Sequence, residues 1–203
     1  MTKVFYLMRH GQTRFNEQGR IQGASDSPLT DLGIQQAQAA QAYFQENQII
    51  FSKVYASTQE RACDTAEIAS GRSDYIRLKG LKEQDFGAFE GHQEYLNPHL
   101  FLDGSGYRDY FVAYGGEDNV SVYKRMEETL TAIMEEATSD DTVLVVSHGA
   151  AIGQFNANVA HNQLKRKSRF TNCCILKIAY ADGKFEVLSG FNPVTSESLF
   201  EEE

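Results

Sequence analysis

The chain has 203 residues, of which 41% are hydrophobic, so it is long enough to bury a substantial core and has the usual size of one domain. Its 19 basic and 28 acidic residues give a formal net charge of -9 at pH 7, which argues against nucleic acid or an anionic membrane as a partner, because both select for a basic surface. We therefore expect a single domain over residues 1–203, in which a local cluster of cations would have to attract any anionic ligand.

Cysteine usage and the N-terminus indicate the compartment. Cys63, Cys173 and Cys174 have neither the spacing of a metal site nor that of a disulfide framework, which is typical of reduced core residues. A single lysine precedes an apolar run of about six residues, far shorter than the apolar region of a signal peptide, and no run reaches the roughly 18 residues of a membrane helix. We expect a cytoplasmic protein.

The first predicted element is a buried strand over Val4–Met8, which ends in Arg9 and His10. Gly11 then lets the backbone turn away. Because ligands of open α/β sheets sit at the carboxyl ends of the strands, we expect Arg9 and His10 to face a crevice. From this stretch alone, the alternative is a histidine that caps the strand for structural reasons.

The next part of the chain repeats this pattern. Residues 10–30 contain several glycines and no sustained periodicity, so they predict a loop over the strand end. Thr30 is expected to cap a helix that continues to about Glu46. A second short strand over Lys53–Ala56 leads into a helix that carries Arg61.

The middle of the chain lacks regular patterns. Residues 75–91 are turn-rich and include the acids Glu83 and Glu90. The following residues, to about Gly116, are rich in aromatic side chains and glycine. We interpret this aromatic segment, from residue 92 to about residue 116, as a lid or pocket wall, with additional core packing as the alternative.

Asp118 is expected to cap a long helix that continues to about Ala137. The most strand-like run of the chain, Thr142–Val146, is followed by Ser147-His148-Gly149 and by a helix over Ala150–Val159. A second histidine therefore follows a buried strand.

Two further runs, Cys173–Tyr180 and Lys184–Leu188, flank Ala181-Asp182-Gly183 and predict a terminal hairpin. The acidic end, residues 201–203, is expected to fray. The sequence shows no repeat or linker. The alternation of strands and helices indicates an α/β fold with a mostly parallel central sheet, which becomes antiparallel where the hairpin joins it.

Three strand ends should meet at one edge of this sheet, because parallel strands end on the same side. Together with further motifs they make the chain resemble the histidine phosphatase superfamily, which includes the cofactor-dependent phosphoglycerate mutases. The resemblance spans nearly the whole chain, and six motifs in family order are far more specific than any single match. The matching motifs are Arg9-His10-Gly11-Gln12-Thr13 with Asn16; Gln22-Gly23 with Asp26-Ser27-Pro28-Leu29-Thr30 and Gly33; Ser57, Arg61-Ala62 and Thr65-Ala66; Glu83 with Phe86-Gly87 and Glu90-Gly91; Gly115-Gly116-Glu117; and Val146-Ser147-His148-Gly149.

The resemblance implies a three-layer α/β/α fold of the phosphoglycerate mutase type and phosphoryl transfer through a phosphohistidine, with no metal and no cofactor. His10 is then the nucleophile, whose ring has to be neutral to attack. Arg9 and Arg61 clamp the phosphate oxygens, because phosphoryl transfer depends mostly on positioning and positive charge. His148 is a further donor to the transferring group. Substrate contacts are implied for Asn16, Gln22 and Gly23.

Glu83 matches the family's acid. Its carboxyl has to be protonated when the ester oxygen leaves and ionised when water attacks the phosphohistidine, so one group serves both half-reactions. Without the neighbouring Phe86-Gly87 and Glu90-Gly91 matches, a solvated loop acid would be the ordinary interpretation. No family position matches His92, His99 or His161.

The residues after the acid favour hydrolysis over transfer to an organic acceptor. Mutases of this superfamily typically follow their acid with Arg-His-Tyr-Gly and carry further arginines for the substrate carboxylate, whereas Gln84-Asp85-Phe86-Gly87 follows it here. Few basic side chains lie between Glu83 and His148: apart from histidines they are Arg108, Lys124 and Arg125. A doubly anionic acid such as phosphoglycerate would find few partners.

We therefore expect a histidine acid-type phosphatase that hydrolyses a small-molecule phosphate monoester. The first alternative is a cofactor-dependent phosphoglycerate mutase-type phosphotransferase. The second is a non-catalytic phospholigand-binding regulator, which should lack His10, Glu83 or an arginine, and this chain keeps them all. The sequence does not distinguish a monomer from a homodimer.

Overall fold

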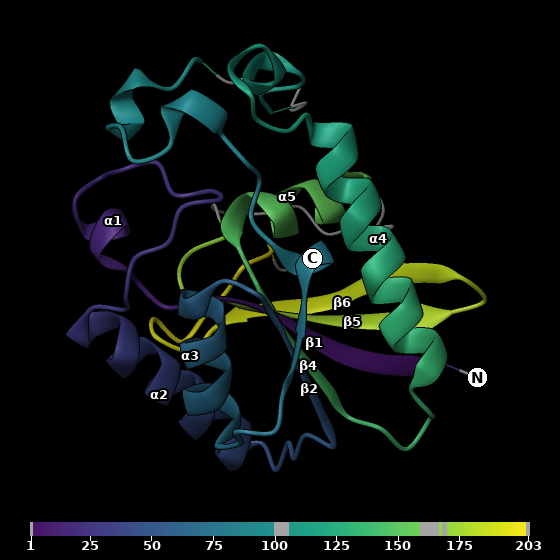
Figure 1. Ribbon diagram of the computed structural model, residues 1–203. Helices are drawn as coiled ribbons and strands as arrows, with labels where there is room; N and C mark the ends of the chain where they lie inside the picture. Colours follow the sequence, from purple (N-terminus) through teal and green to yellow (C-terminus); the bar gives the residue numbers. More distant parts are fainter. Residues whose placement is uncertain (1, 100–105, 159–166, 168–169, 202–203) are drawn as a thin grey trace.

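The computed structural model describes residues 2–99, 106–158, 167 and 170–201. Within them, seven strands form one sheet in the order β3-β2-β4-β1-β5-β6-β7 (Figure 1). Their bounds are β1 Lys3–Arg9, β2 Lys53–Ser57, β3 Ile76–Leu78, β4 Val143–Ser147, β5 Ile175–Ala181, β6 Lys184–Asn192 and β7 Glu197–Ser198.

The first four strands of that order run parallel to one another, and β5, β6 and β7 are added antiparallel. This arrangement confirms the expected mostly parallel sheet with an antiparallel edge. The β5–β6 hairpin is also confirmed, and it turns at Asp182 and Gly183, which both have positive φ. β3 was not expected, because three residues with two exposed side chains leave no hydrophobic pattern to recognise.

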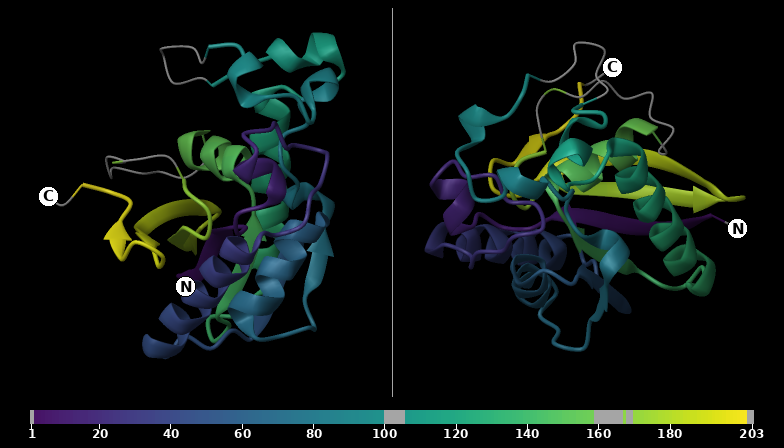
Figure 2. Two further views of the ribbon diagram at one scale, coloured as in Figure 1. Left: turned by 90° about the vertical axis from the view of Figure 1, so that its left-hand side faces the viewer. Right: turned by 45° about the horizontal axis from the view of Figure 1, so that its top comes forward.

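Helices cover both faces of the sheet, which gives the three-layer α/β/α fold (Figure 2, right). One face carries α2 (Asp31–Glu46) and α3 (Glu60–Ser70). Their alanines form a buried core with Tyr6 and Met8 and with the side chains of β2 and β4 that point to this face. The other face carries α4 (Asn119–Glu136) and α5 (Gly149–Asn158), which pack on Leu7, Val145 and the hairpin. The expected C-terminal residue of the last helix, Val159, lies outside the described residues.

The expected helix caps are present. Thr30 Oγ1 accepts the N–H of Gly33, and Asp118 accepts the N–H of Ser121. The loop expected over residues 10–30 contains a four-residue helix, α1 (Arg14–Glu17), that the sequence analysis missed. A capping box closes it, because the Thr13 and Asn16 side chains each bond the other's backbone N–H, and a single turn is too short to show helical periodicity.

The aromatic segment forms a small core of its own above the sheet (Figure 2, left). Phe86 and Phe111 meet edge to face with ring centroids 4.9 Å apart, and Phe111 is fully buried. Tyr95, in contrast, is 81% exposed. The structure therefore supports core packing for the inner rings of this segment, and Phe101 lies outside the described residues. The short 3-10 helices here and before it are η1 Lys79–Leu81, η2 Gly87–Phe89, η3 Glu94–Leu96 and η4 Tyr110–Tyr114.

Within the described part of the chain, no helix has the length and apolar character needed to cross a membrane.

The cap of α2 gives a test of the fold. Replacing Thr30 by Ala removes the hydroxyl that accepts from Gly33 and donates to Gln12 Oε1 at 2.8 Å, so we expect the free energy of unfolding to fall by about 1 kcal/mol. Thr30→Ser keeps the hydroxyl and should retain most of the stability. Urea unfolding of the two variants measures the difference, and equal stabilities would contradict this role of the cap.

Candidate active site

The carboxyl ends of β1, β2 and β4 lie side by side, as the sequence analysis expected. Arg9 pairs with Ser147, and Ala56 pairs with Val146, so the residues that follow these strands emerge at one edge of the sheet. His10 and His148 are the residues directly after β1 and β4. The two imidazole centroids are 5.1 Å apart.

Arg61, from the first turn of α3, lies between the two histidines. Its Nε donates to His10 Nε2 at 3.3 Å and to His148 Nδ1 at 3.2 Å. All three side chains are buried, and the guanidinium is completely inaccessible to solvent. The structure therefore brings together three of the predicted site residues from three strand-to-helix connections.

The hydrogen bonds assign the tautomers of both rings. His10 Nδ1 lies 2.7 Å from the carbonyl oxygen of Gly11, which can only accept, so Nδ1 carries the proton and Nε2 holds a free electron pair toward Arg61. His148 Nδ1 accepts from Arg61, so the proton of this ring is on Nε2. That Nε2–H is buried and has no partner among the described residues. It is available to donate to a ligand.

The surroundings keep both imidazoles neutral. Burial lowers the pKa of His10 well below its ordinary value of 6.5, and the positive charges of Arg61 and Arg9 lower it further. Burial also lowers the pKa of His148, with the charges of Arg61, His10, Arg9 and Arg125 adding to the effect. A neutral His10 with an unprotonated Nε2 is the form that can act as a nucleophile.

Acceptors from one loop hold the buried guanidinium. Arg61 Nη1 donates to Asp26 Oδ1 at 2.7 Å and to the carbonyl of Ser25 at 2.9 Å, while Nη2 donates to the carbonyl of Gly23 at 3.0 Å. Asp26 supplies the negative charge that a buried cation needs. Asp26 belongs to one of the matching motifs, and its role as the counter-ion of Arg61 was not expected.

Glu90 in turn holds that loop. Its carboxylate accepts the backbone N–H groups of Gly23, Ala24 and Ser25 at 3.0, 2.8 and 3.1 Å. At Gly23 a Cβ atom would lie 2.0 Å from the carbonyl oxygen of Gln84, so only glycine fits. Gly23 therefore acts through its backbone, and its expected substrate contact stays a prediction.

Arg9 is the last residue of β1, directly before His10. Its Nη1 donates to the carbonyl of Phe170 at 2.7 Å, and its Nε is buried without a partner among the described residues. A Cβ atom on Gly149 would lie 3.2 Å from the guanidinium carbon, so the glycine after His148 makes room for this side chain. Arg9 thus keeps a buried donor for a ligand.

Asn16 and Gln22, for which substrate contacts are expected, differ in which side-chain groups remain available to a ligand. Asn16 Oδ1 accepts from the N–H of Thr13 at 3.3 Å and from Asn172 Nδ2 at 3.2 Å, which turns its amide nitrogen away from both. Asn172 also donates to the carbonyl of His10 at 3.0 Å. Gln22 uses its amide oxygen for Thr13 and its amide nitrogen for Ser27, so its expected substrate contact stays a prediction.

The carboxylate of Glu83 lies at the N-terminus of α5, the helix that begins directly after His148. Its carboxylate accepts the N–H groups of Ala150 at 3.0 Å and Ala151 at 2.8 Å, and also that of Gln84 at 3.0 Å. Free N–H groups at a helix N-terminus interact favourably with a negative charge. Because Ala150 is two residues after His148, this contact links the predicted acid to the histidine cluster.

Sequence reasoning missed several residues that build this site. Asn172 connects His10 to Asn16, and Gln59 accepts the N–H of Glu83 at 2.9 Å with its side-chain oxygen. Both act on residues far away in the sequence, where no local pattern signals the contact. For Asp26 a signal exists, since it is the acid of the matching motif before Pro28.

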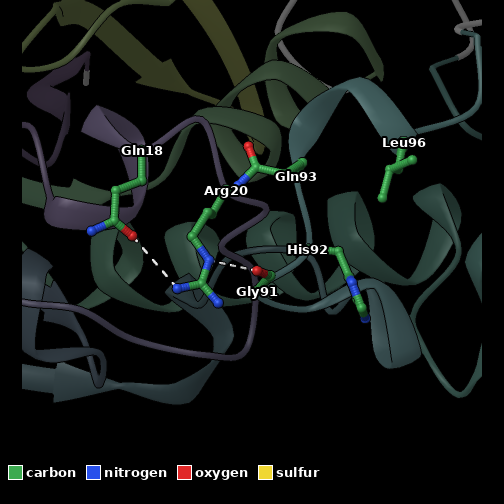
Figure 3. A pocket seen from close by; sticks show the side chains of 6 residues that line it. All are labelled: Gln18, Arg20, Gly91, His92, Gln93 and Leu96. Atoms are coloured by element: carbon green, nitrogen blue, oxygen red, sulfur yellow. Dashed lines mark hydrogen bonds between the residues drawn. The ribbon is translucent and has the colours of Figure 1, made fainter.

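A shallow pocket is lined by none of the site residues described above (Figure 3). In it Arg20 Nε donates to the carbonyl of Gly91 at 2.6 Å, and the guanidinium stacks 4.4 Å from the centroid of the Phe15 ring. His92 lines this pocket on the opposite side of Gly91 from Arg20. No role in the site was expected for His92, and His161 lies outside the described residues. The residues that line this pocket are Gln18, Arg20, Gly91, His92, Gln93 and Leu96.

Comparisons with known proteins show what the chain is similar to. The family description of the histidine phosphatase superfamily, branch 1, matches residues 5–192. A probable phosphoglycerate mutase GpmB from Proteus mirabilis is 33% identical over 86% of this chain and 84% of its own length. The fructose-2,6-bisphosphatase TIGAR B of Danio rerio is 32% identical over 75% of this chain and 58% of its own length. A crystal structure of a mutant phosphoserine phosphatase from Entamoeba histolytica, in complex with phosphoserine, superposes with a TM-score of 0.71 at 27% identity, over 93% of this chain and 96% of that one.

The lowered histidine pKa values predict how stability depends on pH. Unfolding exposes both rings, whose pKa then returns to about 6.5, so the unfolded chain binds more protons than the folded one below that pH. The free energy of unfolding should therefore fall as the pH drops below about 6.5, by up to about 1.4 kcal/mol per pH unit for each ring. Urea unfolding between pH 7.5 and 5.5 (about two units) measures this slope.

The double variant His10→Gln, His148→Gln is the control, because it lacks both groups and should show a shallower slope. A slope that is unchanged in this variant would show that the two histidines are not the source of the pH dependence.

Proposed function

The chain belongs to the histidine phosphatase superfamily, branch 1, and from this premise we propose that it hydrolyses a small-molecule phosphate monoester through a phosphohistidine, without a metal ion. One observation carries the proposal: His10 presents an unprotonated Nε2 beside the buried guanidinium of Arg61. Because His10 Nε2 and Arg61 Nε lie 3.3 Å apart, the histidine can bind a phosphoryl group while the arginine stabilises its negative charge.

In the first half-reaction, His10 Nε2 attacks phosphorus and the bond from phosphorus to the ester oxygen breaks. Arg9, Arg61 and the Nε2–H of His148 stabilise the charge on the three phosphoryl oxygens. Glu83 gives its proton to the departing oxygen, so the product is a neutral alcohol. The Gly11 carbonyl keeps its hydrogen bond to Nδ1–H and stabilises the positive charge that develops on the ring.

In the second half-reaction, water attacks phosphorus and the bond to His10 Nε2 breaks. Glu83, now ionised, takes a proton from the attacking water and is ready for the next cycle. Inorganic phosphate leaves, and the imidazole returns to the neutral form that its surroundings favour. The same carboxyl therefore acts as acid and as base.

The contacts of Arg125 and the exposure of Lys124 favour hydrolysis over a mutase reaction. Arg125 donates to three backbone carbonyls and to Glu117, so its guanidinium is occupied by the protein. Lys124 is exposed on α4. A substrate with a carboxylate in addition to its phosphate would need cations beyond Arg9 and Arg61. Neither Arg125 nor Lys124 supplies one.

A phosphoglycerate mutase reaction is the second candidate, because the GpmB relative carries that name. It uses the same phosphohistidine and differs only in the acceptor of the phosphoryl group. A non-catalytic phospholigand-binding regulator is a weaker candidate, since His10, Arg61 and Glu83 are all present and connected. The comparisons include names of both enzyme classes, so turnover has to decide.

The test is a set of turnover assays without added metal. We expect phosphate release from p-nitrophenyl phosphate and from members of a panel of sugar, amino-acid and alkyl phosphates, unchanged by EDTA. His10→Ala should lower kcat/KM by at least about a thousandfold, because it removes the nucleophile. His92→Ala is the matched control, since this histidine lies in the separate pocket and its removal should leave activity intact.

Fast isomerisation of phosphoglycerate with negligible phosphate release would replace the phosphatase proposal by the mutase alternative. An active His10→Ala variant would exclude His10 as the nucleophile. Loss of activity with EDTA would contradict a metal-free mechanism.

A further inference from the structure

The segment that carries Glu83 has no regular secondary structure of its own. It follows η1 and precedes η2, and neither sheet nor helix hydrogen bonds fix the backbone at Glu83. A general acid has to be placed to within a fraction of an ångström of the oxygen it protonates, and a misplacement of about 1 Å can cost a factor of about 100 in rate. Something outside the segment has to hold it.

Arg125, from the second turn of α4, makes the contacts that can do this. Its Nη1 donates to the carbonyls of Gly80 at 2.9 Å and Lys82 at 2.6 Å, and its Nη2 donates to the carbonyl of Glu83 at 2.9 Å. One guanidinium thus gathers three carbonyls from four consecutive residues. The third of them belongs to the predicted acid itself.

Glu117 fixes the guanidinium from the opposite side. Its two carboxylate oxygens accept from Arg125 Nε at 3.0 Å and Nη2 at 2.9 Å, a two-point contact that sets the plane of the group. One of these oxygens also accepts the N–H of Asp85 at 3.0 Å. The pair therefore binds the segment before Glu83 and the segment after it.

The backbone next to the Arg125 contacts packs closely on α4. A Cβ atom on Gly80 would lie 1.8 Å from Thr129 Oγ1, so η1 rests directly on α4 one turn below Arg125. The carboxylate of Glu83 accepts two N–H groups in the first turn of α5, and α4 and α5 pack on each other, with Met126 and Ile152 in the same buried core. The acid is held at its backbone by one helix and at its carboxyl by the other.

We propose that Arg125, oriented by Glu117, is a positioning residue that sets where Glu83 delivers its proton. This inference rests on the proposed role of Glu83 as the acid. Arg125 itself touches neither the histidines nor any group that is free to meet a substrate, since its described contacts are all with backbone carbonyls and Glu117. Its hydrogen bonds therefore act on the step that needs the proton, whereas its positive charge, which Arg125→Lys keeps, adds to the lowered pKa of His148.

This action on the proton-requiring step gives a readout that a general structural role would not produce. An acidic leaving group such as p-nitrophenol departs as the anion without a proton, whereas an alkyl alkoxide cannot leave unprotonated. Displacing Glu83 should therefore slow the cleavage of alkyl phosphates and spare that of p-nitrophenyl phosphate. A collapse of the site around His10 would slow both.

The experiment measures kcat/KM, which reports the first half-reaction, for a series of aryl and alkyl phosphates with leaving groups of graded acidity. Arg125→Met and Arg125→Lys should lower the value about 10- to 100-fold for alkyl phosphates and less than about threefold for p-nitrophenyl phosphate. Lysine should not rescue, because a single ammonium cannot hold three carbonyls and Glu117 together. Lys124→Met is the matched control, since Lys124 is the exposed neighbour on the same helix and its removal should change neither substrate class.

Glu117→Gln provides a second test that keeps Arg125, in case the Arg125 variants fail to fold. The neutral amide weakens the two-point contact, so a smaller loss with the same leaving-group dependence is expected. In a Glu83→Gln background, Arg125→Met should add no further leaving-group dependence, because the group it positions is gone.

Equal losses for all leaving groups, no loss at all, or additive effects in the Glu83→Gln background would overturn the proposal. These outcomes differ from a failure of the proposed function itself. In that case, wild-type protein would not hydrolyse any phosphate monoester, His10→Ala would stay active, or Glu83→Gln would leave the leaving-group dependence unchanged.

Discussion

The site depends on one physical constraint: a guanidinium with no solvent access lies between two imidazoles. A buried positive charge is costly unless its donors are satisfied and its charge is balanced. The protein meets this need for Arg61 with Asp26 and the carbonyls of Ser25 and Gly23. The same guanidinium then fixes the orientation of both rings and, together with their burial, keeps them neutral. The contacts that stabilise the buried Arg61 therefore also hold it where it prepares both histidines for the reaction.

The fold supplies each part of this arrangement from a different layer. Parallel strands place the two histidines next to each other, and α3 brings Arg61 from one face of the sheet. From the opposite face, α4 and α5 hold Glu83 by its backbone and by its carboxylate. Arg61 and Glu83 thus approach the same strand ends from opposite faces of the sheet. The aromatic segment adds its own small core above them and contacts the site through Ala150, which is both packed against that core and bonded to Glu83.

Local sequence patterns predicted what short-range physics determines. The buried strands, the caps at Thr30 and Asp118 and the terminal hairpin all follow from neighbouring residues, and the convergence of strand ends follows from parallel topology. What the sequence did not show depends on contacts between distant residues or on elements too short for a pattern. α1 and β3 belong to the second kind. Asn172, Gln59 and Arg125 belong to the first, because each acts on a backbone group that is distant in sequence and no periodicity marks it.

The assignment of the nitrogen that attacks is the most specific consequence of this geometry. Because Nδ1 of His10 is bound to the Gly11 carbonyl and Nε2 faces Arg61, the phosphoryl group should form its bond with Nε2. Protein mixed with a substrate, quenched in alkaline denaturant and examined by phosphorus NMR with peptide mapping distinguishes the two ring positions. The account predicts phosphate on Nε2 of His10. Phosphate on Nδ1, on His148, or on no histidine during active turnover would contradict it.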